Sequence, residues 1–161
     1  MRYVSQQRFF VGDERLDALS HRVEVPGQDA DLVVLARYMQ VLSESFVAHY
    51  PNRVINIHPA LLPAFPGIDG QQQAFDAGVQ IAGATVHLVD SGMDTGPIIA
   101  QGAVPRLPGD TAVDLKQRIL SVEHQLFSRV LRWAAQGRIK MDQGVVQVDL
   151  PQDEQRWIWC G

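Results

Sequence analysis

The unbroken apolar run at residues 32–36 (LVVLA) is the feature that most limits the folds open to this chain. A short run with no polar residue to mark an exposed face is typical of a strand buried on both faces, as in a parallel sheet. Residues 54–58 form a second predicted strand, which Pro59 ends. Such strands need helices on both faces of their sheet, so the two runs predict an α/β fold.

Helical patterns separate the predicted strands. Ser43 is a suitable N-cap for a helix through Tyr50, and Asp110 or Thr111 for a long helix ending near Ala135. Apolar residues in the long segment recur at steps of three and four, which gives one apolar stripe. The remaining predicted elements are strands at 8–11, 84–89 and 98–104, helices at 14–21 and 71–77, and a hairpin at 139–148. The alternation predicts a Rossmann-like, three-layer domain with a mostly parallel sheet and a C-terminal hairpin.

Composition excludes several classes of protein. The length of 161 residues suits a single domain, over residues 1–161. The 14 basic residues are outnumbered by 18 acidic ones, so a nucleic-acid partner is not expected. No apolar stretch approaches the roughly 20 residues of a membrane span, and the N-terminus lacks a secretory signal. Cys160 is the one cysteine, so a disulfide framework within the chain is excluded and a cytoplasmic location is expected.

Three polar residues stand where ligands of α/β proteins bind. Asn56 and His58 are two positions apart in a predicted strand, so they share a face near its carboxyl end. An amide and an imidazole placed there can both reach one developing oxyanion. Asp94 lies in a loop between glycines and would favour the charged form of a nearby imidazole. Considered without the rest of the chain, Asn56 and His58 can instead form hydrogen bonds to loop backbone, and Asp94 can be a solvated turn residue.

Other titratable residues carry weaker signals. His87 ends a predicted strand and, from the pattern alone, is best explained as a buried histidine with satisfied hydrogen bonds. Glu123 lies beside the apolar stripe and is explained equally well as a surface residue. No His, Cys or carboxylate spacing indicates a metal site. Nucleophile-elbow, phosphate-loop and dinucleotide-binding motifs are not found in the sequence.

Two segments together resemble the signatures of the folate-dependent formyltransferase family. They are residues 56–67 (NIHPALLPAFPG) and residues 83–99 (GATVHLVDSGMDTGPII), and their order and spacing match the family as well. The resemblance covers about residues 31–145. Within the family it is closest to the phosphoribosylglycinamide formyltransferases. The formyltetrahydrofolate deformylases come second, and residues 35–40 (LARYMQ) resemble them.

The resemblance implies a reaction and a role for each residue. A primary amine, that of glycinamide ribonucleotide in purine synthesis, attacks the formyl carbon of 10-formyltetrahydrofolate, and no metal takes part. Asn56 and protonated His58 stabilise the oxyanion, and His58 delivers a proton to the departing folate nitrogen. Asp94 keeps His58 charged and positions a water that relays the amine proton. The residues implied for the folate pocket are Met39, Gln40, Val41, Leu42, Val89, Asp90, Ser91, Gly92 and Met93, and those implied for the acceptor are Pro59, His87 and Glu123.

The N-terminal region departs from the family pattern. Purine-type members begin with an apolar strand and a glycine-rich turn that holds the ribonucleotide phosphate at a helix N-terminus. Residues 1–30 contain neither feature, so we expect a domain truncated at its N-terminus, a different acceptor, or a new use of the first 30 residues. The strand at 32–36 would then form a sheet edge with unpaired backbone groups. We expect residues 1–12 or a second protomer, in a homo-oligomer, to cover that edge.

Three functions remain open from sequence. The first is formyl transfer to an amine, and the second is hydrolysis of the same formyl group by water. The single histidine in His58-Pro59 is typical of the transferase, since the deformylase tends to carry a second histidine at position 59. The third is a homologue that binds folate without turnover, which the missing phosphate turn motivates.

Overall fold

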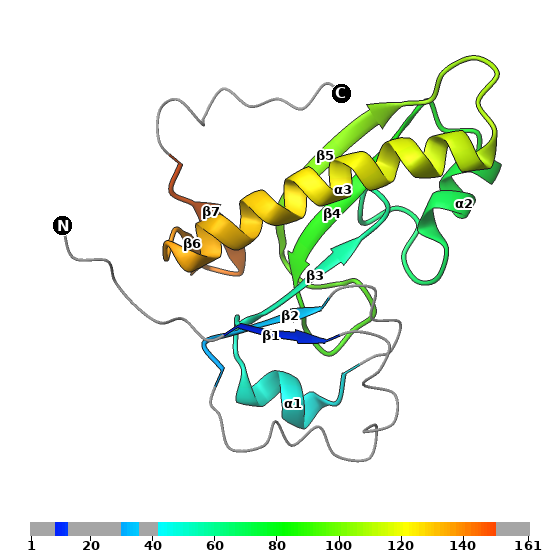
Figure 1. The fold of residues 1–161 in the computed structure, drawn as a ribbon. Helices are drawn as coiled ribbons and strands as arrows, with labels where there is room; N and C mark the ends of the chain where they lie inside the picture. Colours follow the sequence, from blue (N-terminus) through cyan, green and yellow to red (C-terminus); the bar gives the residue numbers. More distant parts are fainter. Residues whose placement is uncertain (1–8, 13–29, 36–41, 151–161) are drawn as a thin grey trace.

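A five-stranded sheet organises the part of the chain that the computed structural model describes, residues 9–12, 30–35 and 42–150 (Figure 1). The strands lie in the order β1-β2-β3-β4-β5, and β6 and β7 form a separate two-stranded sheet. The elements are β1 (Phe9–Gly12), β2 (Leu32–Leu35), α1 (Glu44–His49), β3 (Val54–His58), α2 (Gly70–Asp76), β4 (Ile81–Leu88), β5 (Ile98–Pro105), α3 (Ala112–Ala135), β6 (Ile139–Asp142) and β7 (Val145–Val148).

The main sheet is mixed, whereas the sequence predicted a mostly parallel one. The pairs β1–β2 and β2–β3 are parallel, and the pairs β3–β4 and β4–β5 are antiparallel. Residues 89–97, which join β4 to β5, are too few for a crossover, so β5 has to run back beside β4. The longer connection from β3 to β4 contains α2, which packs mainly on α3 and also contacts β4.

The first strand covers the edge that the sequence left open. Phe9 pairs with Leu32, and the parallel register continues to Gly12 beside Leu35. The prediction that residues 1–12 cover β2 is therefore confirmed, although the strand begins one residue later than the predicted range of 8–11. The predicted strand at 8–11 is thus confirmed, with the bounds Phe9–Gly12. The helix predicted at 14–21 lies outside the described residues.

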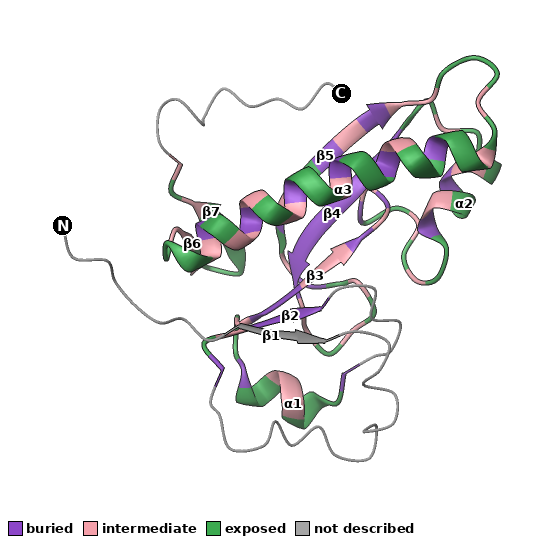
Figure 2. Ribbon diagram, in the orientation of Figure 1, coloured by how far each residue is buried: buried purple, intermediate pink, exposed green. Residues whose placement is uncertain are grey.

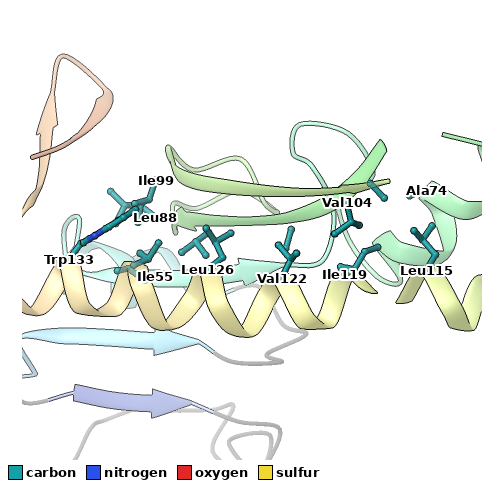
Figure 3. Packing of buried hydrophobic residues seen from close by; sticks show 14 residues of the cluster. Ile55, Ala74, Leu88, Ile99, Val104, Leu115, Ile119, Val122, Leu126 and Trp133 are labelled. Atoms are coloured by element: carbon teal, nitrogen blue, oxygen red, sulfur yellow. The ribbon is translucent and has the colours of Figure 1, made fainter. Parts of the chain in front are cut away.

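The long helix α3 packs along β4 and β5. Thr111 is its N-cap, and Thr111 and Asp114 form a reciprocal capping box. The apolar stripe is buried as predicted, against the sheet residues of the main core (Figure 3). Its members are Leu115, Ile119, Val122, Leu126, Val130 and Trp133. A Cβ added at Gly102 of β5 would collide with Val122, so glycine allows the close approach of helix and strand.

The short helix α1 packs on the opposite face. Ser43 caps it by accepting a hydrogen bond from the Phe46 N–H, as the sequence predicts. Its residues Phe46 and Val47 pack against a second core cluster that includes Val33 and Val54. Ile55 belongs instead to the cluster under α3. Because neighbouring strand residues point to opposite faces, the sheet lies between α1 on one face and α3 on the other. Most of the buried residues of the sheet belong to β2, β3 and β4 (Figure 2).

Strand β4 serves both faces of the sheet. Ala82, Ala84, Val86 and Leu88 belong to the core under α3. The alternate residues of the strand point to the face away from α3. Further along the chain, β6 and β7 form the predicted hairpin, turned at Gln143 and Gly144. Within the described residues no helix has both the length and the apolar character needed to cross a membrane.

Candidate active site

The carboxyl end of β3 places two polar side chains on the face away from α3. In the antiparallel register Asn56 lies opposite His87, and His58 lies opposite Thr85. Directly opposed residues point to the same face, so four polar side chains from two strands gather there. His58, Thr85 and His87 are the buried polar or charged residues of the described part of the chain. Buried polar groups need partners, so their hydrogen bonds define the site.

Asp94 joins the two histidines. It comes from the loop between β4 and β5 and adopts a left-handed backbone conformation, with φ of 55°. Its Oδ2 lies 3.3 Å from His58 Nδ1, and its Oδ1 lies 3.6 Å from His87 Nε2. The Gly67 N–H donates to Asp94 Oδ2 at 2.8 Å. Burial would raise the pKa of Asp94, but the hydrogen bonds from His87 and Gly67 and the charge of His58 together lower it below its usual value.

Both ring nitrogens of His58 face acceptors. Nε2 lies 2.8 Å from the carbonyl oxygen of Phe65, which can only accept, so Nε2 carries a proton. Nδ1 faces the Asp94 carboxylate, which also accepts. A ring that carries a proton on each nitrogen would satisfy both contacts. A Cβ at Gly70 would lie 3.0 Å from Nε2, so the start of α2 closes against the ring.

His87 stands between a donor and an acceptor. Its Nδ1 donates to the Leu88 carbonyl at 2.9 Å, which leaves Nε2 to meet two groups. Asn56 Nδ2 lies 3.3 Å from Nε2, and Asp94 Oδ1 lies 3.6 Å away. A neutral His87 accepts from the Asn56 amide, whereas a protonated His87 donates to Asp94. His87 therefore controls the direction of the Asn56 amide.

The loop that carries Asp94 is held by its own side chains. Asp90 Oδ1 accepts hydrogen bonds from the Gly92 N–H at 3.0 Å and from the Thr95 hydroxyl at 2.7 Å. Gly96 lies against the Leu88 carbonyl so closely that a Cβ would collide with it. The hydrogen bonds of Asp90 thus fix the shape of the loop, and the Asp94 carboxylate faces His58 and His87.

Comparison with known proteins identifies the family. A sequence profile described as formyl transferase matches residues 2–131, which is most of the chain. The chain belongs to the formyl transferase family. It is 50% identical over 104 residues to a phosphoribosylglycinamide formyltransferase of Bacillus subtilis, covering 65% of this chain and 53% of that protein.

Solved structures of formyltransferases have the same fold. The phosphoribosylglycinamide formyltransferase of Anaplasma phagocytophilum matches with a TM-score of 0.75 and 46% identity, over 82% of this chain and 64% of the other. A formyltetrahydrofolate deformylase of Pseudomonas syringae matches with a TM-score of 0.70 and 38% identity, over 74% of this chain and 40% of the other. A phosphoribosylglycinamide formyltransferase of Escherichia coli is 42% identical over 119 residues, and this chain spans 56% of it, so the chain covers about half the length of both relatives.

The family resemblance assigned two segments to the folate pocket, and the structure describes Leu42 of the first and residues 89–93 of the second. Leu42 and Val89 pack in the same core cluster, although they come from different connections. Met93 is exposed and its sulfur approaches Gly67, while Ser91 and Gly92 lie in the loop that Asp90 holds. The predicted Met39, Gln40 and Val41 lie outside the described residues.

The residues predicted for the acceptor are less closely grouped. His87 is part of the central cluster, and Pro59 directly follows His58. Glu123 of α3 accepts a long hydrogen bond from Gln71 Nε2 at 3.4 Å. Gln71 directly follows Gly70, the residue that closes against the His58 ring. No group of three His, Cys, Asp or Glu residues in the described ranges is arranged to hold a metal ion.

Sequence reasoning missed the contacts that orient the histidines. The Phe65 carbonyl and the Gly67 N–H are backbone groups, and no residue type signals them. The alternation of Thr85 with His87 along β4 was visible in the sequence. It could have indicated that Thr85 shares the face of the site.

Proposed function

We propose that this chain transfers the formyl group of 10-formyltetrahydrofolate to a primary amine, with glycinamide ribonucleotide as the acceptor. The observation that carries the proposal is the pairing of His58 with Asp94 beside Asn56, inside a segment that matches the formyl transferase family. Relatives at 50% and 42% identity are phosphoribosylglycinamide formyltransferases, which supports this acceptor. Both substrates are small molecules, and the excess of acidic residues argues against a nucleic-acid partner.

The residues divide the work of acyl transfer between them. The amine attacks the formyl carbon, and negative charge develops on the formyl oxygen. Asn56 has a second amide hydrogen besides the one directed at His87, and it donates this hydrogen to the oxyanion. Loss of one such donor typically lowers turnover about 10²- to 10³-fold. The imidazolium of His58 adds a positive charge beside the same oxygen.

Proton transfer depends on the contacts of His58. Its Nε2 proton is directed at the Phe65 carbonyl, so the ring has to exchange that acceptor for the substrate when it delivers a proton. Asp94 remains a carboxylate at neutral pH because its pKa is lowered, and it keeps the ring oriented through Nδ1. The same carboxylate accepts the amine proton through a bridging water in the proposed mechanism.

We place the donor site on the same side of the sheet. Val89 packs against the core cluster that contains Leu42, next to the loop that carries Asp94, and Met93 exposes a thioether there. Apolar surface with a few fixed polar groups suits a pterin ring.

Hydrolysis of the formyl group is the second candidate. The structural match to a formyltetrahydrofolate deformylase favours it, and the same three residues would serve water as nucleophile. Consumption of 10-formyltetrahydrofolate, measured with and without glycinamide ribonucleotide, separates the two activities. Amine-dependent consumption supports transfer, and formate release without amine supports hydrolysis. Folate binding without either product would contradict both.

His58→Ala tests the assigned chemistry. We expect turnover to fall at least about 100-fold while the fold is retained, because an oxyanion-stabilising group is lost. His124→Ala is the matched control, since His124 is exposed on α3. Near-normal turnover in His58→Ala would contradict the role given to His58.

A further inference from the structure

Three residues form a row across three neighbouring strands on the face of the site. His58 of β3 is opposite Thr85 of β4, and Thr85 is opposite Gln101 of β5. Their side chains therefore point to the same face of the sheet. The row begins at the imidazole of the site and ends at a residue that the family signatures do not assign.

The Thr85 hydroxyl uses its full hydrogen-bonding capacity on the loop that follows β3. It is completely buried, donates to the Ala60 carbonyl at 2.7 Å and accepts from the Leu62 N–H at 3.0 Å. Its second acceptor position is taken by Gln101 Nε2 at 3.0 Å. A hydroxyl offers one donor and two acceptor positions, so none is left for another partner.

Gln101 forms a second hydrogen bond to the backbone of Leu62. Its Nε2 also donates to the Leu62 carbonyl at 2.8 Å, so both backbone groups of Leu62 are bonded to side chains of the sheet. Ala60 and Leu62 are buried, and Leu61 lies over Gly83, where a Cβ would come within 2.9 Å of its Cδ2. Residues 60–62 are thereby fixed to β4 and β5.

The fixed segment leads directly into the two backbone groups that orient the site. The Phe65 carbonyl meets His58 Nε2, and the Gly67 N–H meets Asp94 Oδ2. We propose that Thr85 and Gln101 are positioning residues for His58 and Asp94. By fixing residues 60–62 they set the place of the Phe65 carbonyl and the Gly67 N–H. As far as it concerns turnover, this inference rests on the proposed function.

The central test compares Thr85→Val with Thr85→Ser. Valine has nearly the shape of threonine but no hydroxyl, so it removes all three hydrogen bonds, whereas serine keeps them. In Thr85→Val we expect kcat to fall about 10- to 100-fold with a smaller change in KM, since a misplacement of about 1 Å can cost that much. Thr85→Ser should retain most of the turnover. A purely structural role predicts a lower Tm in Thr85→Val with kcat unchanged in the folded protein, and that result would overturn the proposal.

Two spectroscopic measurements keep the test independent of activity. Hydrogen exchange at the Leu62 amide reports loss of the bond to Thr85, and the imidazole ¹⁵N–¹H signals of His58 report its contact with Phe65. We expect both to change in Thr85→Val and neither in Thr85→Ser. If the wild-type protein proves inactive, the proposed function fails, but the His58 signals still decide the positioning role. Unchanged His58 signals beside a freely exchanging Leu62 amide would refute it.

A milder variant covers the case in which Thr85→Val does not fold. Gln101 is exposed overall, so Gln101→Met keeps its length and removes only the donor to Leu62 and Thr85. We expect kcat and the His58 signals to change in the same direction as in Thr85→Val, but by less. The inference is overturned if Gln101→Met frees the Leu62 carbonyl, seen as a shifted ¹³C signal, but leaves both kcat and the His58 signals as in the wild type.

Discussion

Replacing Asp94 by asparagine removes one charge from the centre of the site and leaves its shape intact. The carboxylate faces His58 Nδ1 at 3.3 Å and His87 Nε2 at 3.6 Å, and only 12% of the side chain is exposed. A hydrogen bond to a charged group of this kind contributes about 1.5–3 kcal/mol. If about 2–3 kcal/mol of it acts in the transition state through His58, turnover falls about 30- to 150-fold, at about 1.4 kcal/mol per factor of ten.

The assay for Asp94→Asn is consumption of 10-formyltetrahydrofolate at saturating amine, compared with folate binding at equilibrium. Binding should change little, because the charge acts on the proton-transfer groups. Asp76→Asn, on the exposed surface of α2, changes the net charge equally and should leave turnover intact. Turnover of Asp94→Asn within about threefold of the wild type, in a folded protein, would refute the electrostatic reasoning.

Two further predictions concern stability and access to the site. Asp110 is bonded to Arg118, which lowers the pKa of Asp110 to about 2, so the stability it contributes is present above its unfolded pKa of about 4 and is lost as pH falls towards 2. The free energy of unfolding, measured with urea between pH 2 and 5, should fall with pH in the wild type and fall less in Asp110→Asn. An equal dependence on pH in the two proteins would contradict this prediction. Gly70→Ala should lower both kcat and Tm, because its Cβ would lie 3.0 Å from His58 Nε2. Gly102→Ala adds a Cβ against Val122 of α3, at a distance from the site, and should lower Tm alone. An equal loss of kcat in both variants would show that the effect of Gly70→Ala is not local.

Much of the fold follows from local patterns in the sequence. The stripe of α3 and its Thr111 cap were predicted because period and capping depend on neighbouring residues alone. The antiparallel direction of β5 beside β4 could have been predicted from the short connection at 89–97. The antiparallel pairing of β4 with β3 could not, because it depends on how the longer connection that contains α2 packs. A run such as Leu32–Leu35 looks the same in a parallel or a mixed sheet.

The candidate site divides in the same way. Asn56 and His58 were paired from their spacing, while Asp94 was tied to them through the family resemblance. The contact between Asn56 and His87 depends on register between strands far apart in the sequence, which composition does not encode. The Phe65 carbonyl was beyond prediction for a different reason, since its place depends on the path of a whole loop.

Strand β4, with one row of residues in the core under α3 and the alternate row in the site, can be neither lengthened nor shortened by one residue. An insertion before Thr85 that no bulge absorbs would turn Thr85 and His87 towards α3 and place Val86 where a polar group is needed. Such a change would remove folding and activity together, whereas changes of length in the loops at either end need not. In a population of variants, β4 should therefore accept substitutions but no insertions or deletions, and a deletion scan across residues 81–88 would reveal this rigidity directly.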